Sequence, residues 1–390
     1  MATLNHYSRF KIKDTRFFIG CLFVLVLIVI IFSTNVKAFD NKLSFQRDIY
    51  NNTLNIKEII LIQNGSLSDL SYVSSSSKKD IEHRDLIKEG IQIQNQDIKL
   101  SYYRLKNQFY YISNNAIELI NRINNYNNKD KFKDIKINNS VIDLNILELK
   151  YKTDLIQSNK TKHSLIFGFN YIQGKTIENR NYKVNLDITE HSNPFFETPL
   201  LVKGNSNNYF LHKDSENYGI SLGLGGEIKL ENNLDLTIYI NNLLGFVKWE
   251  KMRYEYSKID SDTAYLDEKG FINYDASIKG KWKEFDYEMD LPKALTIDLN
   301  KKIGSWVFVS ELTAREYFLG DFSKKSYWSF KNSIVYDYKG NLFSIGFDVP
   351  NKLHLLSYKN NNLGFDLTFD NINLTKINGV GSRFYYSLKF

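Results

Sequence analysis

Cysteine and proline are almost absent from this chain. Its 390 residues include one cysteine and four prolines. A single thiol excludes a disulfide scaffold and a multi-cysteine metal site, and so few prolines exclude a proline-rich linker protein. The mean hydropathy of −0.37 excludes a bundle of transmembrane helices. Hydrophobic and aromatic residues are abundant, at 43% and 15%, which indicates a folded protein rather than a disordered chain.

The one long apolar run lies near the N-terminus. Four basic residues precede the run from Phe17 to Phe32, and polar residues follow it before Ala38. This order is typical of a secretory signal peptide, with cleavage predicted between Ala38 and Phe39. The alternative is an uncleaved membrane anchor, although the run is slightly shorter than the about 20 residues that span a bilayer.

Most of the net charge of +7 belongs to this first segment. Residues 1–38 hold five basic residues and one acid, so about +3 remains on the rest of the chain. No dense Lys/Arg patch remains, and nucleic acid is therefore not an expected partner. We divide the chain into a signal peptide at 1–38, an N-terminal segment at 39–141 and a strand-rich region at 142–390.

In the strand-rich region, apolar residues alternate with polar or small ones at a period of two, which is the period of β-strands. Leu363, Phe365, Leu367 and Phe369, for example, alternate with small or polar residues. A soluble sandwich would bury the apolar face against a second sheet, whereas a membrane barrel turns it to lipid and its polar face to a water-filled lumen. The low mean hydropathy and the many aromatic residues favour the barrel, because aromatic residues concentrate at membrane interfaces.

The last residues of the sequence strengthen this interpretation. Phe384, Tyr386, Leu388 and Phe390 share one face of a final strand. An alternating C-terminal strand that ends in Phe resembles that of Gram-negative outer-membrane β-barrel proteins. The resemblance implies an all-β fold, a transmembrane antiparallel barrel in the outer membrane. It also implies that the barrel-assembly machinery reads these four residues as an insertion signal.

Short Asn-, Gly- and Lys-rich turns set the expected strand count. We predict twelve strands, near 142–156, 163–171, 182–190, 218–230, 234–246, 293–300, 305–313, 327–337, 342–349, 352–358, 363–370 and 381–390. A further hairpin at 87–112 would raise the count to fourteen. Part of 39–141 could instead form a plug inside the lumen, and the sequence leaves both alternatives open.

Residues suited to catalysis or metal binding are sparse. The histidines show neither HxxxH nor HExxH spacing, and no GxSxG motif occurs. His163-Ser164 and His191-Ser192 are neighbours, so within a strand each pair points to opposite faces and forms no nucleophile–base contact. We expect no metal, no cofactor and no enzymatic activity.

Residues 234–299 carry a second resemblance. The stretch Asn241–Trp249, the segment 247–291 and then Leu291-Pro292 opening a strand are similar to the FadL/TraF-like barrel group. This group includes long-chain fatty-acid transporters and conjugal-transfer-associated barrels with about fourteen strands. The Asn-Pro-Ala motif of the fatty-acid transporters is absent, since the nearest candidate, Asn115-Ala116, lacks the proline.

Two functions follow from this fold. The first is a porin-like channel or transporter for small or hydrophobic solutes, with outer-membrane lipid as its surroundings and an unidentified solute. The second is a non-transporting barrel that serves as accessory or anchor for a surface, secretion or conjugation assembly. The expected outer loop 247–291 carries aromatic residues that could form a binding surface or simply pack the loop, namely Trp249, Tyr254, Tyr256, Trp282 and Tyr287. The predicted lumen charges have mixed sign, so we expect no strong ion selectivity; they are Lys183, Asp187, Asp235, Asp366 and Lys389.

Overall fold

The computed structural model describes most of the chain after residue 39. The described residues are 40–51, 80–95, 97–118, 131–158, 160–188, 200–211, 217–260, 264–266, 272–274, 279–318, 324–371 and 380–389. The chain divides into Met1–Phe39 and Asp40–Phe390, and all described residues belong to the second unit. The predicted cleavage site at Ala38 and Phe39 lies outside them. Within the described residues, no helix is long and apolar enough to cross a membrane.

Nearly all of these residues form β-strands. The strands are β1 (Asp40–Asn51), β2 (Ile81–Gln94), β3 (Ile98–Ile112), β4 (Lys131–Gln157), β5 (Thr161–Ile188), β6 (Leu200–Leu211), β7 (Tyr218–Leu230), β8 (Leu234–Asp260), β9 (Ala264–Leu266), β10 (Ile272–Tyr274), β11 (Lys279–Asp290), β12 (Ala294–Ile303), β13 (Trp306–Phe318), β14 (Lys324–Tyr338), β15 (Asn341–Asp348), β16 (Leu353–Lys359), β17 (Leu363–Phe369) and β18 (Val380–Lys389). One short helix spans 114–118.

Sixteen of these strands form a closed antiparallel barrel with 14 positions. β18 pairs with β1 and closes the ring. Two positions each hold two strands in succession: β6 and β7 lie between β5 and β8, and β11 and β12 lie along the other edge of β8. We call the end that carries the short turns, such as 231–233 and 339–340, the C-terminal rim, because β18 ends there. The opposite end is the far rim.

The outer face of the barrel is apolar. On β15, Phe343 and Ile345 are 49% and 64% exposed, while Ser344 between them points into the lumen. Further exposed apolar residues on this face include Leu43, Ile91, Phe167, Leu224, Ile238, Leu299, Phe308, Phe330, Phe365 and Phe384. A continuous apolar surface of this size is not stable in water, and a closed sheet leaves no unpaired backbone for lipid. The predicted membrane barrel is therefore confirmed.

A row of aromatic residues crosses seven adjacent strands on this outer face. The residues are paired directly from strand to strand in the order Trp306, Tyr336, Phe343, Tyr358, Phe365, Phe384 and Phe45. The rings of Trp306 and Tyr336 lie 4.7 Å apart. Such rows are typical of membrane interfaces. Of the predicted insertion signal, Phe384 lies in the row and Tyr386 is also exposed, whereas Phe390 lies outside the described residues and Leu388 is placed only as part of β18.

The barrel wall begins earlier than expected. β1, β2, β3 and the first part of β4 precede residue 142, so a barrel confined to 142–390 is too short. The hairpin expected near 87–112 is present as β2 and β3, which pair from Ile81↔Ile112 to Gln94↔Lys99. The described residues of 39–141 thus belong almost entirely to the wall.

Two predicted connections are strand. Separate strands are predicted at 163–171 and 182–190, but the first and the described part of the second both belong to β5. The residues between them stay paired with β4 through a bulge beside Gly174. The expected loop 247–291 consists largely of the ends of β8 and β11, which pair with each other. Many of their outward residues are polar and resemble those of a connection.

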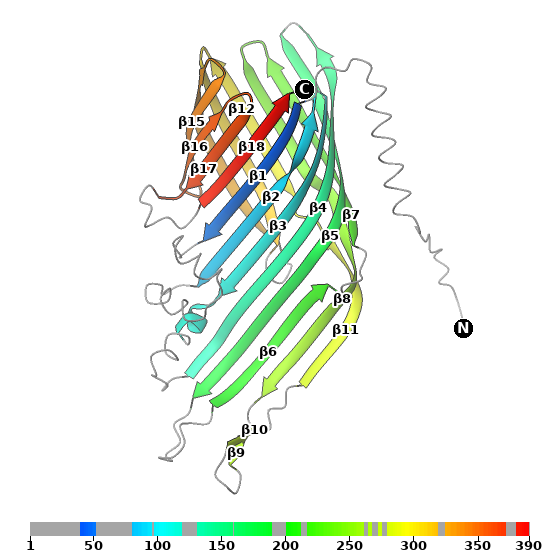
Figure 1. Ribbon diagram of the computed structural model, residues 1–390, viewed down its shortest axis with the longest axis vertical. Helices are drawn as coiled ribbons and strands as arrows, with labels where there is room; N and C mark the ends of the chain where they lie inside the picture. The colour runs from blue at the N-terminus through cyan, green and yellow to red at the C-terminus, as the bar shows by residue number, and fades with distance from the viewer. Residues whose placement is uncertain are drawn as a thin grey trace, which may run out of the picture. The chain divides into compact units, whose positions relative to one another are not determined.

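The strands differ greatly in length. β4, β5 and β8 contain 27, 28 and 27 residues, whereas β15, β16 and β17 contain 8, 7 and 7. A transmembrane strand needs about 9 to 11 residues, so the long strands continue beyond the membrane. Figure 1 shows β4, β5, β6, β8 and β11 running past the ends of β1 to β3. We call this projecting part the extension, and it comprises residues 131–142, 177–188, 200–211, 247–260 and 279–290.

Candidate functional site: the lumen

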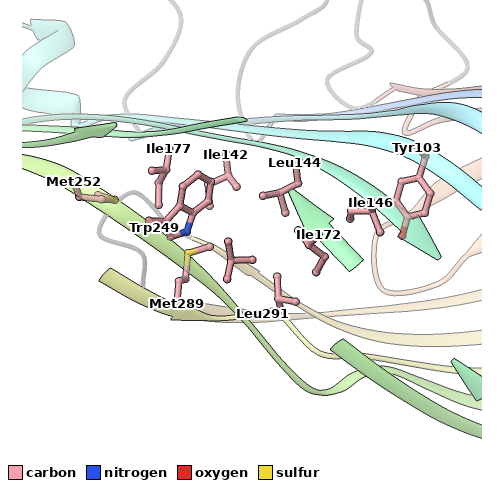
Figure 2. Packing of buried hydrophobic residues seen from close by; sticks show 11 residues of the cluster. Tyr103, Ile142, Leu144, Ile146, Ile172, Ile177, Trp249, Met252, Met289 and Leu291 are labelled. Carbon is pink, nitrogen blue, oxygen red and sulfur yellow. The ribbon is translucent and has the colours of Figure 1, made fainter. Parts of the chain in front are cut away.

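The lumen is crossed by a layer of apolar side chains where the barrel meets the extension. Ile177, Val247, Trp249 and Met252 in this layer have no exposed surface. We call the cluster the apolar layer, and its members are Tyr103, Ile142, Leu144, Ile146, Ile172, Ile177, Val247, Trp249, Met252, Met289 and Leu291. Figure 2 shows Ile142, Leu144 and Ile177 facing Met252, Met289 and Leu291 from opposite walls.

Local backbone features bring these side chains together. Trp249 packs against Gly174, where an added Cβ would lie 2.6 Å from the indole ring. Lys251 has a positive φ of 53°, which together with a register shift between β8 and β11 turns both Trp249 and Met252 inward. Asn217 accepts the amide N–H of Glu250 at 3.0 Å and so fixes the backbone beside Trp249.

A charged layer follows directly below the apolar layer, toward the C-terminal rim. Along the inner face of β4, Ile146 is succeeded by Glu148, Lys150 and Lys152. Lys150 Nζ lies 3.1 Å from a carboxylate oxygen of Glu148, and Lys152 Nζ lies 2.5 Å from Glu227. The inner face of β4 thus changes from apolar to charged between Ile146 and Glu148, which are two residues apart.

Tyr239 lies flat against the wall beside this charged layer. An added Cβ at Gly168, Gly223 or Gly225 would come within 2.0 to 2.7 Å of the Tyr239 side chain. Lys150 Nζ lies 4.2 Å from the ring centre. The register between β7 and β8 shifts between Leu222 and Leu224, beside these glycines. The glycines therefore create the space that the tyrosine fills.

A cavity of about 300 Å³ lies in the lumen among β1, β2 and β13 to β18. Glu311 on its wall pairs with Lys331 at 3.3 Å. Asp348 accepts hydrogen bonds from Ser329 at 2.7 Å and from Asn351 at 2.8 Å. The acids of the cavity wall are thus held by neighbouring groups, and the cavity is lined by charged as well as apolar side chains.

The structure separates the aromatic residues expected to form one outer surface. Trp249 belongs to the apolar layer, and Tyr287 packs against it. Tyr254 and Tyr256 lie on the same inner face of the extension, directly paired with Lys283 and Lys281. Trp282 points outward and is 64% exposed. The prediction of one shared aromatic surface on a loop is therefore wrong, because these residues point to different faces of two paired strands.

Several lumen residues that the fold brings together were not predicted from the sequence, among them Lys88, Lys99, Glu148 and Arg315. The run Ile142-x-Leu144-x-Ile146 before Glu148 was an available signal, since it places an apolar and then a charged series on one face. Lys88 and Lys99 gave no such signal, because the hairpin that holds them was only one of two alternatives for this segment.

The residues considered for catalysis do not form a nucleophile–base pair among the described residues. Ser164 donates a hydrogen bond to Asp154 at 2.8 Å, and its neighbour His163 lies on the other face of β5. His191 lies outside the described residues. Within the described part of the chain, no group of three or more His, Cys, Asp or Glu could hold a metal ion.

No family model matches the sequence, and no curated protein matches it. Several solved barrels are similar in outline. The toluene transporter TodX of P. putida is 10% identical over 92% of this chain and 91% of that chain, with a TM-score of 0.44. The translocator domain of the autotransporter NalP from Neisseria meningitidis is 7% identical over 91% and 90%, with a TM-score of 0.34. The toluene transporter TbuX of Ralstonia pickettii is 9% identical over 90% of this chain and 89% of that chain, with a TM-score of 0.23.

These values are too low to support an argument about function. The barrel assignment rests on the closed ring of strand pairs and on the apolar outer face. The 14 positions agree with the strand number of the FadL/TraF-like group, to which the sequence bears a resemblance.

Proposed function

We propose that this protein is a channel of a Gram-negative outer membrane that admits small solutes through its lumen. The cavity of about 300 Å³ inside the closed barrel, lined in part by charged side chains, is the observation that supports this most directly. A barrel that served only as an anchor could fill its interior with packed side chains, as small barrels do. Here charged groups line open space instead.

The apolar layer would act as the gate of this channel. Hydrophobic constrictions control conduction by excluding water, and they open when a few side chains move. Trp249 and Met252 come from β8 and meet Ile142 and Ile177 from the facing wall. Displacing the indole ring would join the water of the extension to the cavity below.

Bilayer recordings with a gate variant test this proposal. We expect the wild-type protein to conduct weakly, and the double variant Trp249→Ala/Met252→Ala to conduct several times more, because the layer loses its two largest β8 side chains. Trp282→Ala is the matched control, since it removes an indole that faces outward. If wild type and gate variant are both electrically silent and pass no solute into liposomes, the alternative of a non-transporting accessory or anchor barrel is favoured.

We propose in addition how the protein is exported and inserted into the outer membrane. Export would depend on the segment 1–38, with the mature chain starting at Phe39. Insertion would depend on Phe384, Tyr386, Leu388 and Phe390, read by the barrel-assembly machinery. Fractionation with outer membranes, heat-modifiable gel mobility and N-terminal sequencing test these points. Recovery from the periplasm as a soluble species would contradict them.

A further inference from the structure

Positive charge accumulates on one side of the lumen, just below the apolar layer. Lys88 on β2, Lys99 on β3 and Lys150 on β4 all interact electrostatically with the same acid, Glu148, which is 4% exposed. Lys99 and Lys150 are directly paired across the two strands. Like charges in this position destabilise a sheet, and one carboxylate cannot neutralise three ammonium groups.

A fourth cation reaches the same region from a distant part of the ring. Arg315 on β13 lines the cavity and is an electrostatic neighbour of Lys88. Among the described residues, the guanidinium of Arg315 has neither a hydrogen bond nor an ion pair. By contrast Lys331, on the next strand of the cavity wall, has its own acid partner in Glu311.

A buried hydroxyl points to a missing partner at this site. Ser101 lies on the inner face of β3 between Lys99 and Tyr103, and it is directly paired with Glu148 on β4. Its side chain is 5% exposed, and its Oγ has no hydrogen-bond partner within the described structure. Burying a hydroxyl without a hydrogen-bond partner is unfavourable, and a bound acceptor would relieve this cost.

We propose that Lys88, Lys99, Lys150 and Arg315 form a binding site for a small oxyanion, such as phosphate or a monocarboxylate. Ammonium and guanidinium groups supply charge-assisted donors for its oxygens, and Ser101 supplies a hydroxyl donor. The neighbouring apolar layer limits solvent and so strengthens these interactions. This inference rests on the proposed channel function, since the anion enters through the lumen, and it names small anions as the solute class. It differs from the expectation of no strong ion selectivity, which rested on the mixed sign of the predicted lumen charges.

Calorimetric titration of the full-length protein in detergent tests the site without requiring transport. Inorganic phosphate and sodium acetate are the probes, at low ionic strength so that screening does not mask binding. We expect Lys99→Gln and Arg315→Gln each to weaken binding by about tenfold or more, the usual effect of losing a charged hydrogen-bond donor. Arg315→Lys keeps the charge and should retain most of the affinity. Lys339→Gln, in an exposed turn, makes the same change in net charge and should leave affinity unchanged.

Heat-modifiable mobility first establishes that each variant is folded. No binding of either anion by the wild-type protein would overturn the inference, as would equal affinities in the Gln variants and the Lys339→Gln control. Binding that is lost only in the site variants, in a barrel that proves electrically silent, supports the site and overturns only the channel. Conduction by the reconstituted protein without binding of either anion would support the channel and overturn the site.

Discussion

The long and short sides of the barrel place their apolar residues differently. On the short side, β15 to β17 keep one pattern throughout, with large apolar residues such as Ile345 outward and Ser344, Ser357 and Thr368 toward the lumen. On the long side the pattern inverts within a single strand. β8 turns Ile238 outward near the C-terminal rim, but it turns Trp249 inward in the extension.

The inversion shows where lipid gives way to water. In the membrane the solvent is apolar and the interior is wet, so apolar side chains face out. In the extension both faces meet water, so apolar side chains gather between facing walls, as in a soluble sandwich. An ion cluster supports this boundary on β2 to β4, where outward-facing Arg104 pairs with Asp143 at 2.6 Å and with Glu89 at 3.4 Å.

The largest effect is expected from filling a glycine on the short side. Gly364 on β17 lies under the ring of Tyr385, and an added Cβ would come 1.7 Å from the ring carbon Cζ. Gly364→Val should therefore prevent β17 and β18 from pairing and abolish the heat-modifiable folded form on gels. Gly226→Ala is the control, because its Cβ would meet its nearest atom at 3.6 Å. Normal assembly of Gly364→Val would show that Tyr385 can leave this position freely.

Removing the central side chain of the long side should come next. Trp249→Ala leaves a cavity in the apolar layer and should lower the free energy of unfolding by about 3 to 5 kcal/mol. Trp249→Phe keeps part of the packing and should cost clearly less. Denaturant unfolding in lipid vesicles measures both. An unchanged midpoint for Trp249→Ala would mean that the extension unfolds independently of the barrel.

A charge placed on the outer face distinguishes the two solvents directly. Ile345→Lys puts an ammonium group on the lipid face of β15 and should cost about 2 to 4 kcal/mol near the midplane of the bilayer. Tyr182→Lys introduces the same ammonium group on the outward face of β5 within the extension. There we expect a loss of stability of about 0.5 kcal/mol or less. Similar costs for the two variants would contradict the membrane boundary inferred from the inversion.

The smallest effect is expected at the exposed indole of the extension. Trp282 on β11 is contacted by the Arg253 guanidinium, whose carbon lies 5.0 Å from the ring centre. Trp282→Ala should lower stability by about 0.5 to 1 kcal/mol, the usual value of such a contact at an exposed site. A loss comparable to that of Trp249→Ala would indicate that the outer face of the extension is covered in the native protein.

From β4 onward the membrane-facing strands could be predicted from the sequence, whereas β1 and the extension could not. β7, β15 and β17 lie where the period of two placed them, because lipid imposes one uniform face. The same rule failed for 172–181 and 247–260, where paired strands face water and the apolar residues change sides. The cation site could not be predicted either, because Arg315 comes near Lys88 only through the closure and register of the whole ring.

The seam between β1 and β18 has a consequence for the biogenesis of the protein. Asp40 to Ile49 pair with Lys389 to Val380, so the first and last described strands are neighbours. Until β18 has been synthesised, β1 and β17 each keep a bare edge, and such edges recruit other chains. Each unpaired backbone group in lipid would cost several kcal/mol. The polypeptide must therefore travel unfolded and protected, and its ring can close only after translation has delivered the final strand.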